Sequence, residues 1–189
     1  MAHARIARTC LIVLATGAAL VAAVPAHAGP APVRTVGVAS TDGSGGAWTY
    51  NDDMLPAGAR LSVHVAYPGD GMSVVTLTVK GVRANREYGA HAHKAACTSN
   101  GADALGHFQY LANPDLLNPT DPTYANPTNE IWLDLQTNSA GNATSKAVVP
   151  WQPDVTRPMS VVIHEMHTGT GPGDAGTAGA RLACMTVPF

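Results

Sequence analysis

The sequence predicts an all-β domain, an antiparallel sandwich or barrel. Seven short runs alternate apolar and polar residues or are rich in β-branched residues, at 47–50, 60–67, 73–79, 88–93, 130–135, 143–149 and 159–165. Turn-forming residues separate these runs, most clearly at 68–71, 138–141 and 150–158. None of the runs has the 3.6-residue period of an amphipathic helix. Short strands between turns, without helices, are typical of a β-sandwich or barrel.

The N-terminal residues 1–28 are typical of a secretory signal peptide. Arg5 and Arg8 precede an apolar run at 11–24, and Ala26-His27-Ala28 forms a small-residue cleavage site. A membrane anchor is the alternative, but the apolar run is short for a bilayer span and Pro25 follows it. We therefore expect an exported protein with no membrane anchor after cleavage, from which Cys10 is removed with the peptide.

Residues 29–45 are rich in Gly, Pro, Ala and Ser and are expected to form a flexible leader, with at most one loose strand at 33–39. Residues 46–189 are expected to form the folded domain. The 161 residues that remain after cleavage at residue 28 are enough for one domain with a substantial core. This part has 13 acidic and 9 basic residues, a net charge of −4, which argues against nucleic acid or an acidic membrane surface as a partner.

Two cysteines, Cys97 and Cys184, remain after cleavage. In an oxidising compartment an even number of cysteines predicts disulfide bonds, here a single one. Two free, buried thiols are the alternative.

Four histidines are the strongest indication of a functional site. Residues i and i+2 of a strand point to the same side, about 7 Å apart, so His91 and His93 can face one metal ion. His107 follows between Gly106 and Phe108, and His164 comes much later. A set of imidazole nitrogens suits copper. The alternative is four unrelated surface histidines.

The order of these residues resembles the copper/zinc superoxide dismutase family. The segments that carry the resemblance are 80–97, 106–108, 161–165 and 178–184, the last containing Arg181-Leu182-Ala183-Cys184. The resemblance implies a Greek-key β-sandwich or barrel and a copper site made by His91, His93, His107 and His164. It also implies that His107 carries a proton during catalysis and that Arg181, otherwise a surface charge, guides the superoxide anion.

The chain departs from that family where a zinc site is expected. No zinc-ligand histidine follows His107, because His164 is the next histidine, and only Glu130 and Asp134 could join His107. Zinc usually has four ligands. Met166-His167-Thr168 stand where the family has an aspartate that links its two metals, and the loop 165–180 has only two acidic residues. The sequence therefore resembles the copper-only, zinc-lacking branch, with residues 112–129 as a long ordered loop.

The remaining candidates have specific expected roles. Glu130 is expected either to accept a hydrogen bond from His107 in place of zinc or to be a solvated strand residue. His64 is expected to face solvent, and His167 is not expected to be a ligand. The main functional prediction is an exported copper-dependent superoxide dismutase. A copper-binding or sequestration protein without dismutase activity is the alternative, an inert structural domain is less favoured, and the sequence leaves the oligomeric state open.

Overall fold

The computed structural model describes residue 1 and residues 30–189. The predicted signal peptide, apart from Met1, lies outside the described residues. Within the described part, no helix is long and apolar enough to cross a membrane. The one helical turn there is η1 (Gly101–Ala104), a 3₁₀ helix capped by the side chain of Asn100.

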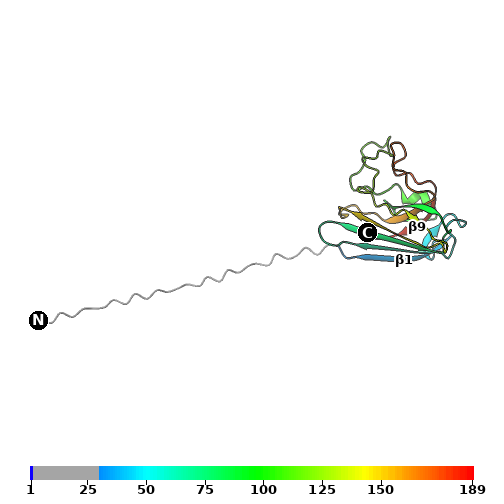
Figure 1. Ribbon diagram of the computed structural model, residues 1–189, viewed down its shortest axis with the longest axis horizontal. Helices are drawn as coiled ribbons and strands as arrows, with labels where there is room; N and C mark the ends of the chain where they lie inside the picture. The colour runs from blue at the N-terminus through cyan, green and yellow to red at the C-terminus, as the bar shows by residue number, and fades with distance from the viewer. Residues whose placement is uncertain (2–29) are drawn as a thin grey trace.

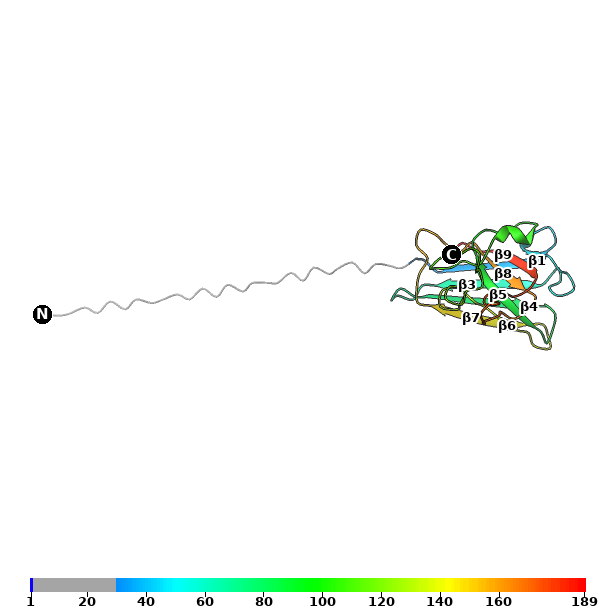
Figure 2. The ribbon, with the colours of Figure 1, turned by 90° about the horizontal axis from the view of Figure 1, so that it is seen from above.

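The described residues form an all-β fold, as the sequence predicts. Nine strands make one sheet in the order β6-β5-β8-β9-β2-β1-β3-β4-β7, and this sheet curls into a nearly closed barrel (Figures 1 and 2). The strands are β1 (Val33–Ser40), β2 (Gly46–Thr49), β3 (Arg60–Ala66), β4 (Ser73–Lys80), β5 (Glu87–His93), β6 (Leu135–Gln136), β7 (Ala143–Val149), β8 (Ser160–His164) and β9 (Arg181–Thr186). β6 and β7 are the two ends of this order, and a turn joins them directly. In that turn the Asn138 amide donates to the Asn142 carbonyl at 3.0 Å.

The alternation of β3 and β4 explains how the core forms. Every second side chain of these strands is buried, and their register pairs inward residues such as Val63 with Leu77. In β5, by contrast, all residues after Glu87 are buried, because both faces of this strand are covered. One face of β5 therefore belongs to the hydrophobic core, and the other lies beneath the long loops.

Several sequence-based expectations need correction. Residues 33–40, expected to lie in a flexible leader, form β1, which pairs with β3 over six positions, so the sheet begins well before residue 46. The C-terminal strand β9 was not among the seven predicted runs. Most of the predicted strand 130–135 is irregular and joins the sheet through isolated bridges and the two-residue β6. The other predicted strands differ from the observed ones by no more than one or two residues at an end.

The sheet is also not purely antiparallel, since β1 and β2 pair in parallel over three positions. Parallel neighbours normally need a long crossover, whereas only residues 41–45 separate these two strands. Glycines permit the tight reversal. A Cβ on Gly45 would lie 2.1 Å from the Val38 carbonyl oxygen, so no other residue fits there without a shift of the backbone.

The disulfide prediction is confirmed. Cys97 and Cys184 are bonded, with their Cα atoms 5.7 Å apart and 87 residues apart in sequence. The bond joins the segment after β5 to β9, two parts of the chain that both contribute to the site described below. Above the barrel, the loops 111–129 and 165–180 project together (Figure 1).

Candidate metal centre

Strand β5 positions the first two histidines of the site. Its period of two places His91 and His93 on one face, while Ala90 and Ala92 enter the hydrophobic core on the other. Both imidazoles are fully buried. The local sequence alone therefore determines that this pair faces the same way, as expected for residues i and i+2 of a strand.

The neighbouring strand β8 contributes His164. The register places His164 opposite Gly89, and an irregularity between Ile163 and His164 shifts the pairing of β8 with β9 at this point. A side chain on Gly89 would not fit, because its Cβ would lie 2.6 Å from the Met166 carbonyl oxygen and 2.7 Å from the Ala178 Cβ. The glycine thus lets the start of the loop 165–180 approach β5 closely.

His107 reaches the site on the segment that follows η1. This segment lies along the last residues of β5, where the Phe108 amide donates to the Ala92 carbonyl at 2.9 Å and the Lys94 amide to the Gly106 carbonyl at 3.1 Å. A bridge pairs His107 directly with His93. His107 is the most accessible of the four histidines, with 16% of its side chain exposed.

The four histidines converge. One ring nitrogen from each of His91, His93, His107 and His164 lies within 4.8 Å of the others, and this is the one metal-type group of His, Cys, Asp and Glu among the described residues. The His93 and His164 Nε2 atoms are 3.2 Å apart. The opposite nitrogens face outward: His93 Nδ1 donates to the Leu105 carbonyl at 2.9 Å, and His164 Nδ1 lies 3.4 Å from the Gly179 carbonyl.

The donor atoms fit a bound metal ion. His91 uses its Nε2 in a 2.7 Å hydrogen bond with the Thr168 hydroxyl. Its Nδ1 is buried and has no hydrogen-bond partner. A buried polar atom without a partner costs free energy, and a metal ion at the centre of the cluster would satisfy this one. Three histidines thus offer Nε2 to the cluster and His91 offers Nδ1.

Burial also favours the neutral form of three of the four histidines. Burial, and then the neighbouring imidazoles, lower the pKa of His91 well below 6.5. Burial together with the charge of a protonated His107 lowers the pKa of His93 to about 2 and that of His164 to about 3. Neutral imidazole is the form that binds a metal ion.

Glu130 holds His107 in place. This buried carboxylate accepts hydrogen bonds from His107 Nδ1 at 2.8 Å, from Gln109 Nε2 at 2.8 Å and from Trp132 Nε1 at 2.7 Å. The hydrogen bond between Glu130 and His107 is one of the two roles that the sequence left open for Glu130, whereas the contacts of Gln109 and Trp132 had no sequence signal. With Nδ1 engaged as a donor, His107 turns its Nε2 toward the cluster.

A second carboxylate acts on His91 through a hydroxyl group. Asp134 accepts from the Thr168 hydroxyl at 2.6 Å and from the Thr168 amide at 3.0 Å, and Thr168 in turn contacts His91. The sequence offered no signal for this connection, because 34 residues separate Asp134 from Thr168. His167 lies outside the cluster, with its Nδ1 3.3 Å from Asp134, and His64 is exposed as expected.

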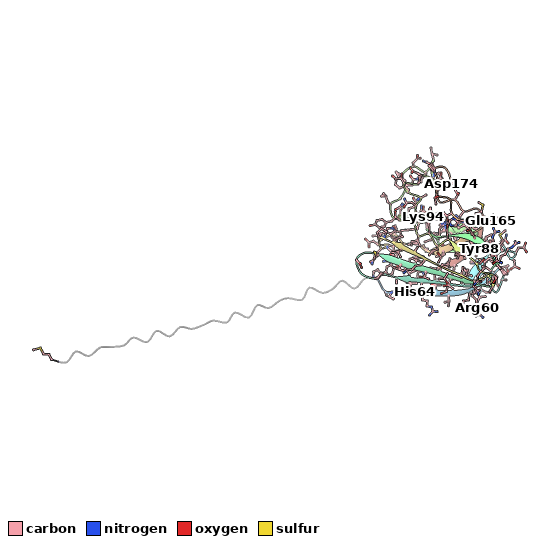
Figure 3. The ribbon with its side chains drawn as sticks, viewed as in Figure 1. Arg60, His64, Tyr88, Lys94, Glu165 and Asp174 are labelled. Atoms are coloured by element: carbon pink, nitrogen blue, oxygen red, sulfur yellow. A yellow bond between two sulfur atoms is a disulfide. The ribbon has the colours of Figure 1, made fainter. Side chains whose placement is uncertain are left out.

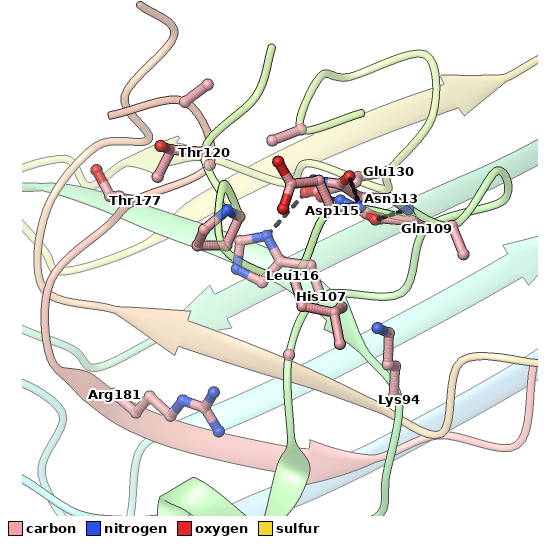
Figure 4. A pocket seen from close by; sticks show the side chains of 16 residues that line it. Lys94, His107, Gln109, Asn113, Asp115, Leu116, Thr120, Glu130, Thr177 and Arg181 are labelled. Carbon is pink, nitrogen blue, oxygen red and sulfur yellow. Dashed lines mark hydrogen bonds and ion pairs between the residues drawn. The ribbon is translucent and has the colours of Figure 1, made fainter. Parts of the chain in front are cut away.

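Arg181, the first residue of β9, lies at the rim of a cavity beside the cluster. Its guanidinium donates to the carbonyls of Gly101 and Leu105, which fix its position. The cavity has a volume of about 430 Å³, and Lys94 and His107 line it together with Arg181 (Figure 4). The loop 111–129 and residues 175–177 form its other walls. Two cations, Lys94 and Arg181, thus line the cavity together with the carboxylates of Asp115 and Glu130, next to His107, the most accessible histidine of the four.

Comparison with known proteins gives the family. No family model matches the chain. Over 134 residues it is 30% identical to the Cu-Zn superoxide dismutase of Podospora anserina, a match that covers 62% of this chain and 81% of that protein. A crystal structure of a double mutant of a superoxide dismutase-like protein from Bacillus subtilis has a TM-score of 0.50 at 16% identity, covering 67% of this chain and 88% of that one, and supports the fold. The chain therefore belongs to the Cu-Zn superoxide dismutase family.

Proposed function

We propose that this protein is an exported, copper-dependent superoxide dismutase of the copper-only type. The observation that carries the proposal is the convergence of four imidazole nitrogens, one of them buried without a hydrogen-bond partner, beside a cavity that Lys94 and Arg181 line. Imidazole nitrogens are ligands that copper favours. His91, His93, His107 and His164 would hold the ion, which when bound supplies the one-electron redox chemistry that converts superoxide to oxygen and hydrogen peroxide.

The protein's own residues account for the remaining steps. Arg181 attracts superoxide and orients it at the wall of the cavity, because its guanidinium is held by two carbonyls and keeps free charge toward the anion. His107 lines the same cavity and carries a proton to the reduced oxygen species. Glu130, by accepting from Nδ1 of His107, keeps the Nε2 of that ring directed inward for this exchange.

The arrangement of carboxylates supports the copper-only assignment. Glu130 is bonded to three donors around His107, and Asp134 is bonded to Thr168 on the His91 side, so the two serve different histidines. Zinc would need both of them turned toward His107, together with a fourth ligand. We expect about one copper and little zinc per chain when the protein is folded with both metals, as measured by elemental analysis. One zinc that resists chelation would refute this assignment.

Export is proposed from residues 1–28 and agrees with the Cys97–Cys184 disulfide, a bond typical of oxidising compartments. Mass spectrometry of the protein recovered outside the cytoplasm should find a chain that starts at Gly29. A full-length chain retained in the cytoplasm would contradict this part of the proposal.

The same fold would also suit a protein that only binds or sequesters copper. Arg181 distinguishes the two functions, since a copper store has no need for a fixed cation over an open cavity. Copper-loaded wild type should consume superoxide much faster than His91→Ala, which loses a ligand. Arg181→Ala should lower kcat/KM while leaving copper affinity nearly unchanged. Wild type no faster than His91→Ala would exclude the dismutase and leave the copper-binding function.

A further inference from the structure

The outer face of the barrel over β1, β3, β4 and β7 is not used by the metal centre. Alternate residues of these strands enter the core, and the others lie on the surface. In Figure 3, Arg60 and His64 lie along the lower edge of the molecule, whereas Lys94 lies higher and Asp174 lies near the opposite, upper end. We refer to the surface residues of these four strands as the outer sheet face.

Charge is unevenly distributed over the molecule. Of the 11 Lys and Arg residues, Arg5 and Arg8 precede residue 30, and four of the other nine are exposed on the outer sheet face: Arg34, Arg60, Lys80 and Lys146. None of the 13 acidic residues belongs to these four strands. Within the described part, none of the four cations is within ion-pair distance of a carboxylate. A chain of net negative charge thus presents one positive face.

Strand register arranges these cations in two rows that run across the sheet. One row consists, in order, of Arg34, His64, Thr76 and Lys146. The other pairs Arg60 with Lys80. Between them lies a row of Val36, Ser62, Thr78 and Thr144. Successive rows are two residues apart, about 7 Å along a strand, so a band of hydroxyl groups has cations on both sides.

The middle row is open to a ligand. A groove of about 460 Å³ on this face is lined by the cations Arg34, Arg60 and Lys80, by the hydroxyls of Ser62 and Thr78, and by the exposed side chains of Val36 and Val38. The hydroxyls of Thr78 and Thr144 are 3.1 Å apart and can each act as donor or acceptor. Cations flanking hydroxyls along a groove match a ligand with negative groups on both sides of a hydroxyl-rich chain.

We propose that the outer sheet face binds an extended anionic polysaccharide, which lies across the strands along the hydroxyl row. Its sulfate or carboxylate groups pair with the two cationic rows, and its sugar hydroxyls bond Ser62, Thr78 and Thr144. The other anionic polymers fit less well. The four strands contain no Phe, Tyr or Trp on which nucleic-acid bases could stack, or which could anchor in a bilayer interface. A symmetric contact with a second copy would oppose cation to cation.

The test measures binding to immobilised dextran sulfate, with neutral dextran as the reference surface, at 50 and 300 mM salt. Wild type should bind dextran sulfate only, and more weakly at the higher salt, because exposed charges are screened. The variant Arg34→Gln/Arg60→Gln/Lys80→Gln should bind at least tenfold more weakly. The control Arg83→Gln/Lys94→Gln/Arg157→Gln removes the same charge elsewhere and should stay within twofold of wild type.

The hydroxyl row supplies an independent readout. Ser62→Ala/Thr78→Val keeps every charge and should weaken binding severalfold. The face variants should bind copper as tightly as wild type does, which reports that they are folded. If the triple variant does not fold, the single variants Arg60→Gln and Lys80→Gln replace it. Three results would each overturn the proposal. They are an equal loss of binding in the control variant, no binding by wild type at 50 mM salt, and tighter binding to vesicles of anionic lipid than to dextran sulfate.

Discussion

Acid should unfold the metal-free protein through the histidine cluster itself. Burial holds the pKa of His93 at about 2, that of His164 at about 3 and that of His91 well below 6.5. In the unfolded chain the pKa of each returns to about 6.5. Because the folded pKa is the lower one, the unfolded state binds more protons below pH 6.5, and stability is lost as the pH falls from 6.5 toward the folded values.

The expected loss is large. Between pH 7 and pH 5, proton uptake by the unfolded chain costs about 2 kcal/mol for each of His93 and His164, or about 4 kcal/mol for the two, and His91 adds to the loss in the same direction. A domain of this size is stable by about 5–15 kcal/mol in total. With a urea m value of about 2 kcal/mol per M, the unfolding midpoint should fall by at least about 2 M. The effect belongs to the metal-free protein, in which the ring nitrogens of the cluster have no metal ion to bind.

Urea unfolding of chelator-treated protein at pH 7, 6 and 5, followed by tryptophan fluorescence, measures this loss. His164→Asn should lose about 2 kcal/mol of this pH dependence, since one buried imidazole is gone. His64→Asn is the matched control, because His64 is exposed on β3 and reaches water in both states. An unchanged midpoint between pH 7 and pH 5 in the metal-free wild type would refute the reasoning.

Three further predictions concern copper, steering and the disulfide. Glu130→Gln removes the charged partner of His107 and should weaken copper binding 10–100-fold in a chelator competition. An affinity within twofold of wild type would contradict this. Lys94→Gln should lower kcat/KM about twofold at low ionic strength and match wild type in high salt, since one exposed charge near the anion contributes about 0.5 kcal/mol in water and is screened by salt. Lys146→Gln, on the far face, is its control and should change neither value. Replacing Cys97 and Cys184 by Ala opens an 87-residue loop and should cost roughly 4.5 kcal/mol of unfolding free energy at pH 7, measured in urea; a loss below about 1 kcal/mol would show that the bond contributes little.

Local pattern was sufficient for much of the barrel. Strands β3, β4 and β7 follow from apolar alternation between turns, because a strand with one face in the core must repeat every two residues. The same period places His91 and His93 on one side of β5 without knowledge of any neighbour. Composition and cysteine number were enough to predict the disulfide, since only two cysteines follow residue 28.

Other elements had no local signal. β9 lies between β8 and β2, so both of its edges are paired and residues 182–185 are buried on both faces, which removes the alternation that marks a half-exposed strand. Residues 130–134 have the pattern of a strand, but they pair with their neighbours only through isolated bridges, and the side chains of Glu130 and Asp134 accept hydrogen bonds from His107 and from the Ala90 amide. Residues 29–45 are rich in Gly, Pro, Ala and Ser, which predicts a leader with at most one loose strand, yet β2 and β3 pair with the two edges of β1.

The sequence by itself determined which residues could bind a metal ion; the tertiary structure decided how their ring nitrogens are used. The presence of two histidines and the two-residue period of the strand that carries them can be recognised from a few neighbouring residues. The choice of Nδ1 for His91 depends on Thr168, which is 77 positions away, and on Asp134 behind it. The position of Arg181 depends on carbonyls 76 and 80 residues earlier. Such contacts form only when the barrel is complete, because the packing of the strands and loops brings together residues that are far apart in the sequence.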